Sequence, residues 1–99
     1  MFVMVTSTVP LHKQPETQPI FQKMLETPLP PSVKRLHLFL RPDLESGSKS
    51  FSILEVEAGK EWEGLQAIYA SVGQYNSIEG FRYSVDIVAD ALAAPPQTG

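Results

Sequence analysis

The sequence predicts one α+β domain in which four strands and two helices follow in the order β-α-β-β-α-β. Four segments alternate apolar and polar residues, as strands do, and two segments repeat apolar residues every three or four positions, as amphipathic helices do. Hydrophobic residues make up 42% of the 99 positions, which is enough for one packed core, and cysteine is absent. Neither a disulfide framework nor a thiolate metal site is therefore expected.

The first strand is predicted over residues 2–9, which are rich in β-branched side chains. Val3, Val5 and Val9 lie on one side of this segment, and Pro10 ends it. Residues 11–18 are polar and contain a proline, so they are interpreted as a connection.

The first helix is predicted to start at a cap formed by Thr17 or Gln18, with Pro19 in its first turn, where a missing amide hydrogen costs little. Its apolar stripe consists of Ile20, Phe21, Met24 and Leu25. Three prolines at positions 28, 30 and 31 are expected to end it.

The second strand is predicted over residues 33–41 because alternation is clearest there. One side is apolar and the other is mixed. The apolar side carries Leu36, Leu38 and Leu40, and the mixed side carries Arg35, His37, Phe39 and Arg41. Residues 42–49 have the composition of a loop, and residues 51–57 alternate again as a third strand.

The second helix is predicted from about residue 60 to Gly73, a residue type that often follows a helix end. Its apolar positions are Trp62, Leu65, Ile68, Tyr69 and Val72. Trp62 and Tyr69, together with Phe21 of the first helix, are expected in the core. Residues 81–88 alternate as the fourth strand, and residues 89–99 form a tail of small residues and prolines.

This order of elements predicts a ferredoxin-like sandwich over residues 1–88, with both helices on one face of a four-stranded antiparallel sheet. The helix-free face would then carry apolar side chains such as Met4, Phe39, Phe51 and Ile53 among charged ones. An exposed patch of this kind usually marks an interface, so a homodimer is expected.

The strand Ser50-Phe-Ser-Ile-Leu-Glu-Val-Glu57, the following helix with Trp62 and the mixed sheet face resemble the dimeric α/β-barrel superfamily, especially its small single-domain proteins of unknown function. The resemblance implies that two sheets pair face to face and enclose a cavity. It also implies that a small organic molecule binds there, in some members as the substrate of a cofactor-free oxygenase, isomerase or dehalogenase-like enzyme.

The expected site lies on the helix-free face. His37 is the candidate catalytic acid or base, because a histidine near a carboxylate in a water-poor cavity can move a proton. The candidate ligand-binding residues are Arg35, Glu55, Arg82 and Asp86, where an arginine would hold an anionic group. The alternative is that these charges pair with one another simply to satisfy a half-buried surface.

Other functional classes find little support in the composition. The net charge of −3 argues against a nucleic-acid partner, which requires clustered Lys and Arg. No apolar run reaches the length of a bilayer span and no basic leader precedes the first strand, so a cytoplasmic protein is expected. Only two histidines are present, without metal-ligand spacing, so neither a metal site nor a cofactor is expected. A non-catalytic regulatory or assembly module of ferredoxin-like fold, which would associate through strand edges, remains the alternative function.

Overall fold

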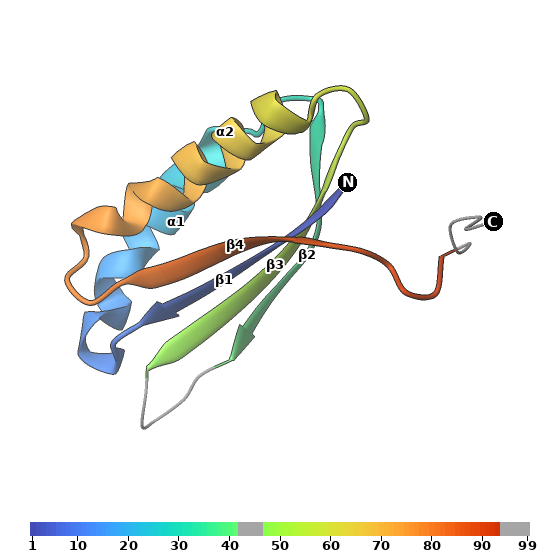
Figure 1. The fold of residues 1–99 in the computed structure, drawn as a ribbon. Coiled ribbons are helices and arrows are strands. Elements are labelled where there is room, and N and C mark those ends of the chain that lie inside the picture. Colours follow the sequence, from blue (N-terminus) through green and yellow to red (C-terminus); the bar gives the residue numbers. More distant parts are fainter. Residues whose placement is uncertain (42–46, 94–99) are drawn as a thin grey trace.

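Two layers make up residues 1–41 and 47–93, the part of the chain that the computed structural model describes (Figure 1). One layer is a sheet of four strands, β1 (Phe2–Val9), β2 (Val33–Arg41), β3 (Ser48–Val56) and β4 (Arg82–Val88). The other layer consists of α1 (Thr17–Glu26) and α2 (Glu61–Gly73), which lie on the same side of the sheet. All strand pairs are antiparallel and the order is β2-β3-β1-β4, which is consistent with the predicted ferredoxin-like arrangement. The predicted α+β class is confirmed.

The boundaries of β1 and β2 match the sequence prediction, whereas those of other segments differ, most clearly after Pro10 and before β3. The predicted connection after Pro10 contains a 3₁₀-helix, η1 (Leu11–Glu16), which continues directly into α1. Thr17 Oγ1 donates a hydrogen bond to the Gln14 carbonyl at this junction, at 2.6 Å. The third strand begins at Ser48, before the predicted start at residue 51, because Ser48 pairs with Val9 at the end of β1. Residues 42–46 of the predicted loop and residues 94–99 of the tail lie outside the described residues.

A β-bulge in β2 changes which face its side chains occupy. Arg35 pairs with Leu54 and His37 with the adjacent Ile53, so Leu36 is an extra residue on the β2 side of the ladder. A bulge of this kind breaks strict alternation along a strand. Arg35 therefore lies on the helix-facing side of the sheet, and its predicted place on the helix-free face was wrong.

The core lies between α2 and the sheet. Val3, Leu54 and Val56 are fully buried in the sheet, and Ile68 of α2 packs on them. Gly64 allows this close approach, because a Cβ atom there would lie 2.4 Å from Val56 Cγ1. α2 begins with Glu61 and Glu63 in its first turn, where carboxylates favour the positive end of the helix dipole.

The prediction that Trp62 and Tyr69 belong to the core was wrong, because their side chains are 73% and 48% exposed. Each residue of an α-helix advances by about 100°, so both positions lie about 100° to 120° around α2 from Ile68. Ile68 faces the sheet, and the two aromatic rings consequently lie on the flank of the helix.

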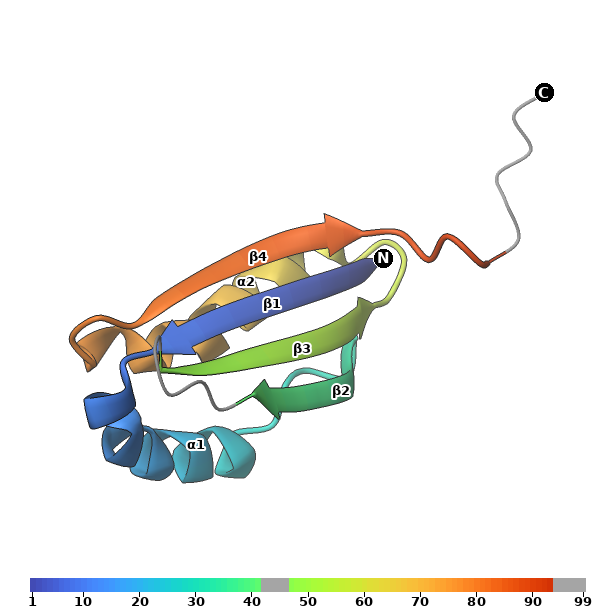
Figure 2. The same cartoon turned by 90° about the horizontal axis from the view of Figure 1, so that it is seen from below.

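α1 stands away from the sheet. Figure 2 shows it beyond β2, while α2 crosses behind β1 and β4. None of its ten residues is buried, and Leu25 is exposed, although Phe21 and Met24 on its inner side are partly covered. The prolines that follow α1 end the helix at Glu26, as predicted. The space between α1, α2 and the sheet contains the candidate site.

Candidate functional site

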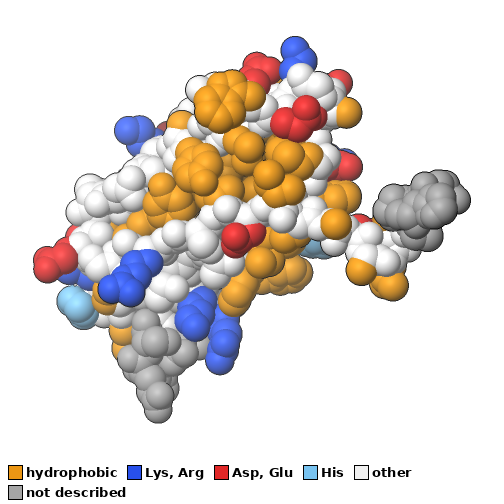
Figure 3. Space-filling view, viewed as in Figure 1, with side chains coloured by type: hydrophobic (Ala, Val, Ile, Leu, Met, Phe, Trp, Pro, Cys, Tyr) orange, Lys and Arg blue, Asp and Glu red, His pale blue; other side chains and the backbone are white. Residues whose placement is uncertain are grey.

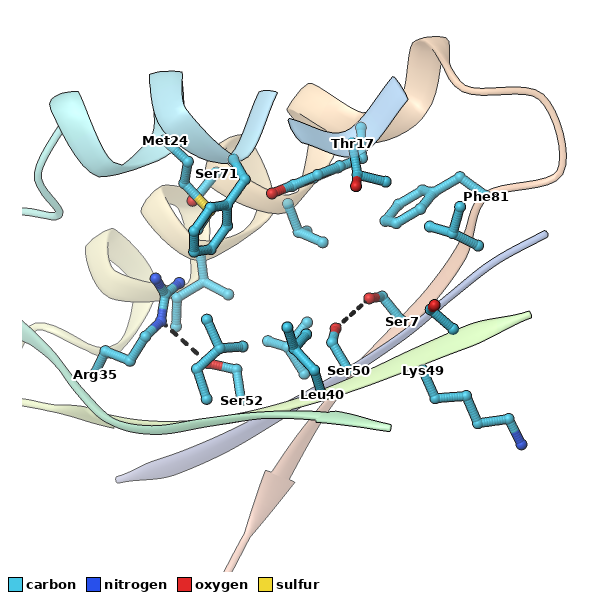
Figure 4. A pocket seen from close by; sticks show the side chains of 18 of the residues that line it. Ser7, Thr17, Met24, Arg35, Leu40, Lys49, Ser50, Ser52, Ser71 and Phe81 are labelled. Carbon is cyan, nitrogen blue, oxygen red and sulfur yellow. Dashed lines mark hydrogen bonds between the residues drawn. The ribbon is translucent and has the colours of Figure 1, made fainter. Parts of the chain in front are cut away.

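A cavity of about 220 Å³ lies between the two helices and the helix-facing side of the sheet (Figure 4). It is therefore on the opposite side of the sheet from the cavity that the sequence predicted. Apolar side chains from both layers form much of its wall, among them Phe21, Met24, Leu38, Leu40, Ile68 and Phe81. Phe21 and Met24 come from α1, whose distance from the sheet leaves this space open.

Serine hydroxyls form the sheet side of the cavity. Ser7 of β1 and Ser50 of β3 are paired in the sheet, and their Oγ atoms share a hydrogen bond. Ser52, which is buried, donates from its Oγ to the His37 carbonyl at 3.3 Å. The helix-facing side of the sheet is thus apolar near Val3 and Leu54, and it carries serine hydroxyls farther along the same strands.

Arg35 supplies a positive charge at one end of the cavity. Its Nε donates a hydrogen bond to Ser52 Oγ at 3.1 Å, and Figure 4 shows the side chain extending from β2 toward the helix that carries Met24. Burial lowers the pKa of Arg35 from its ordinary value, and the nearby Tyr75 opposes this effect. An arginine nevertheless keeps its charge at neutral pH. Within residues 1–41 and 47–93 its guanidinium forms no ion pair with a carboxylate.

Tyr75, in the 3₁₀-helix η2 (Gln74–Ser77) after α2, provides a second hydrogen-bond donor. Burial raises its pKa above the ordinary value of 10.0, although the positive charge of Arg35 acts in the opposite direction. The phenol is therefore protonated at neutral pH and can donate a hydrogen bond. Its ring stacks on Phe81 with centroids 5.4 Å apart, which fixes its position on the cavity wall.

Gln14 and Thr17 line the cavity where η1 joins α1. Gln14 Oε1 is buried and has no hydrogen-bond partner within the part of the chain that the structure describes. Buried polar atoms normally have a partner, so this oxygen is available to a donor on a bound molecule. In Figure 4, Thr17, Ser7 and Ser50 lie across the cavity from Arg35. The cavity thus has the Arg35 guanidinium at one end and hydroxyl groups at the other, where Lys49 also contributes to the lining.

The other predicted site residues lie on the helix-free face and do not converge. His37 is exposed and stacks on Phe39, with ring centroids 5.4 Å apart. One row of paired residues crosses all four strands and consists of His37, Ile53, Met4 and Asp86. His37 and Asp86 stand at the two ends of this row, so they are about 14 Å apart at the usual strand spacing. Glu55 pairs with Lys34 in the sheet register. Arg82 pairs with Thr8, in another row. No described carboxylate forms an ion pair with His37.

The serines of the cavity were not predicted from the sequence, and Arg35 was predicted on the wrong face of the sheet. The sequence contains a signal for the serines only. Ser7, Ser50 and Ser52 occupy positions that continue the alternation of Val3, Val5 and Leu54. Hydroxyls in an otherwise apolar row indicate a polar region facing the helices. For Arg35 no such signal exists, because alternation in the sequence does not reveal a bulge.

Comparisons with known proteins give a fold and no family. No family model and no curated protein matches the chain. Four chains of solved structures match. One of them, a de novo designed protein named Foldit4, is 11% identical and matches 90% of this chain and 100% of its own length with a TM-score of 0.53. The likeness supports the fold alone. Among the described residues, no helix is both long and apolar enough to cross a membrane.

Proposed function

We propose that this protein binds a small organic anion in the cavity between the helices and the sheet. The observation that carries the proposal is Arg35, a charged and partly buried guanidinium on the cavity wall without a carboxylate partner among the described residues. A buried charge costs free energy unless it is paired, so an anionic ligand would supply the missing partner. The planar guanidinium suits a carboxylate, which accepts two parallel hydrogen bonds.

The cavity geometry indicates the size and polarity of the ligand. A volume of about 220 Å³ is smaller than the ~300 Å³ at the lower end of ordinary ligand pockets. The carboxylate is expected near Arg35 and Tyr75, and the apolar body between Phe21 and Leu40. A polar group at the far end of the ligand would meet Ser7 and the neighbouring hydroxyls. Small aromatic acids fit this description.

Isothermal titration with three probes tests the proposal. Benzoate is expected to bind, and 4-hydroxybenzoate is expected to bind more tightly because its hydroxyl reaches the polar end of the cavity. Benzamide has nearly the same shape without the charge, and it should bind at least about tenfold more weakly, since a charge-assisted hydrogen bond contributes about 1.5 to 3 kcal/mol.

Arg35→Gln should remove the preference for benzoate over benzamide. Arg41→Gln is the matched control, because Arg41 lies on the same strand, is exposed and does not line the cavity. Equal affinity for benzoate and benzamide in the unaltered protein, or equal loss of benzoate binding in both variants, would contradict the proposal.

Self-association is a second proposal, favoured by the helix-free face. Phe39 is 58% exposed there, and Met4, Phe51 and Ile53 are only partly covered. Two such faces packed together would give the arrangement expected from the dimeric α/β-barrel resemblance. Sedimentation analysis of Phe39→Glu should show weaker association if the faces pair, whereas unchanged association would exclude this contact. If the paired faces also carry chemistry, His37→Ala should lower turnover or ligand affinity without loss of the dimer.

A further inference from the structure

β4 is an edge strand that has no bulge, proline or lysine, three features that usually prevent edges from pairing. The sheet ends at β2 on one side and at β4 on the other. β2 carries a bulge after Arg35 and the exposed Lys34, which are typical edge protections. β4 contains no proline, glycine or lysine and pairs with β1 in unbroken register. Its outer edge therefore suits a further strand.

Apolar side chains flank this edge on the helix side of the sheet. Ile87 of β4 is 64% exposed, and the exposed ring of Tyr69 contacts Tyr83 of β4 edge to face, with centroids 6.3 Å apart. Figure 3 shows hydrophobic side chains gathered over α2 and the adjoining edge of the sheet. An apolar surface next to an open strand edge indicates an interaction surface.

The charges of β4 identify the partner. Arg82, Ser84 and Asp86 alternate along the helix-free side of the strand, and neither charged residue forms an ion pair within the described ranges. In an antiparallel pair of two β4 strands with Ser84 opposite Ser84, Arg82 of each copy lies opposite Asp86 of the other. Opposite charges directly across an antiparallel pair stabilise it. On the helix side, Tyr83 then faces Val85.

We propose that two copies of this chain pair through their β4 strands, antiparallel and with Ser84 at the centre, to form one continuous sheet. The complementarity is isologous, since each copy contributes the same arginine and the same aspartate, and this is the symmetry of a homodimer. The pairing neither requires nor excludes contact through the helix-free faces. It also does not depend on a ligand in the cavity.

Disulfide trapping tests the register. The chain has no cysteine, so Ser84→Cys introduces a single thiol. Directly opposed residues of an antiparallel pair have Cα atoms about 4.5 to 5.5 Å apart, within disulfide range. Mild oxidation of Ser84→Cys should give a covalent dimer on a non-reducing gel. Thr6→Cys is the matched control, because Thr6 is paired with Ser84 but lies on the interior strand β1. Trapping at position 6 and not at position 84 would overturn the proposal in favour of face-to-face pairing.

Charge reversal tests the partner. Arg82→Asp and Asp86→Arg should each weaken dimerisation about tenfold or more in sedimentation equilibrium, because each places like charges opposite one another. The double variant Arg82→Asp with Asp86→Arg should restore the dissociation constant to within about threefold of the unaltered protein. Both positions are exposed, and an unchanged circular dichroism spectrum would show that the fold is intact. Single variants that associate normally, or a double variant as weak as the singles, would overturn the proposal.

Discussion

Arg35 and Ser52 are joined across β2 and β3 by a hydrogen bond of 3.1 Å from Arg35 Nε to Ser52 Oγ, and the same hydroxyl donates to the His37 carbonyl at 3.3 Å. One buried serine thus contacts the residues on both sides of Leu36, the extra residue of the bulge. This arrangement holds the guanidinium on the cavity side of the sheet. The bulge and the cationic end of the cavity are therefore parts of one structure.

Replacing Arg35 with methionine should stabilise the fold and abolish anion binding. Burial already lowers the pKa of Arg35, which means that its charge is held at a cost. Methionine keeps the apolar stem and removes that cost, so we expect the free energy of unfolding to rise by about 0.5 to 1 kcal/mol after allowance for partial exposure. Urea denaturation measures the change, with Arg41→Met as control. A large destabilisation would indicate that the arginine has a structural role.

Replacing Tyr75 with phenylalanine should reduce the loss of stability at alkaline pH. The pKa of Tyr75 is raised in the folded protein, so below its ordinary value of 10.0 the phenol is neutral in both folded and unfolded chains. Above that pH the unfolded chain ionises first, and stability falls as pH rises. Tyr75→Phe should show a shallower decline from pH 10 upward in denaturation curves. Tyr69→Phe, on an exposed ring, is the control, and parallel curves for Tyr75→Phe and the unaltered protein would contradict the assignment.

Replacing Gly64 with alanine should destabilise the fold although alanine favours helices. A Cβ atom at this position would lie 2.4 Å from Val56 Cγ1 and 3.3 Å from Val33 Cγ2, so α2 would have to move away from the sheet. Overpacking of this kind costs about 1 to 3 kcal/mol. Gly73→Ala in the same helix meets only Asn76 Nδ2, at 3.6 Å, and should be neutral or stabilising by up to about 1 kcal/mol. The midpoint temperature of thermal unfolding should therefore fall clearly for Gly64→Ala and should stay unchanged or rise for Gly73→Ala.

Replacing Gly47 with alanine should be more damaging than the same change at Gly59. Both glycines have positive φ, 94° and 87°, where an L side chain costs about 1 to 2 kcal/mol. At Gly47 a Cβ atom would also lie 2.0 Å from the Val9 carbonyl oxygen, whereas at Gly59 it meets no atom within 4 Å. The difference between the two free energies of unfolding isolates the clash with β1. Equal losses would mean that the backbone at Gly47 can move away from Val9.

The candidate site was only partly predictable from the sequence, for reasons that particular residues make clear. Alternation assigned Val3, Val5 and Leu54 to the helix-facing side, and this assignment is confirmed. The same alternation assigned Arg35 to the opposite face, because a bulge adds one residue without changing the local composition. The ligand cavity was expected on the helix-free face because of the mixed side chains there and the resemblance to proteins that pair two sheets. The cavity under α1 was not predicted, because the sequence pattern gives no information on how closely α1 approaches the sheet.

The sequence by itself determined the α+β class and the approximate limits of the four strands and the two α-helices, because periods of two and of 3.6 residues are local properties of the chain. Only the tertiary structure decided that α2 packs closely through Gly64 while α1 stands apart and leaves a cavity. It also decided that Trp62 is exposed and that Tyr69 contacts Tyr83 of β4, so that neither ring lies in the core. Distances between layers and the angle at which a helix faces a sheet depend on contacts between residues far apart in the chain, and no local period records them.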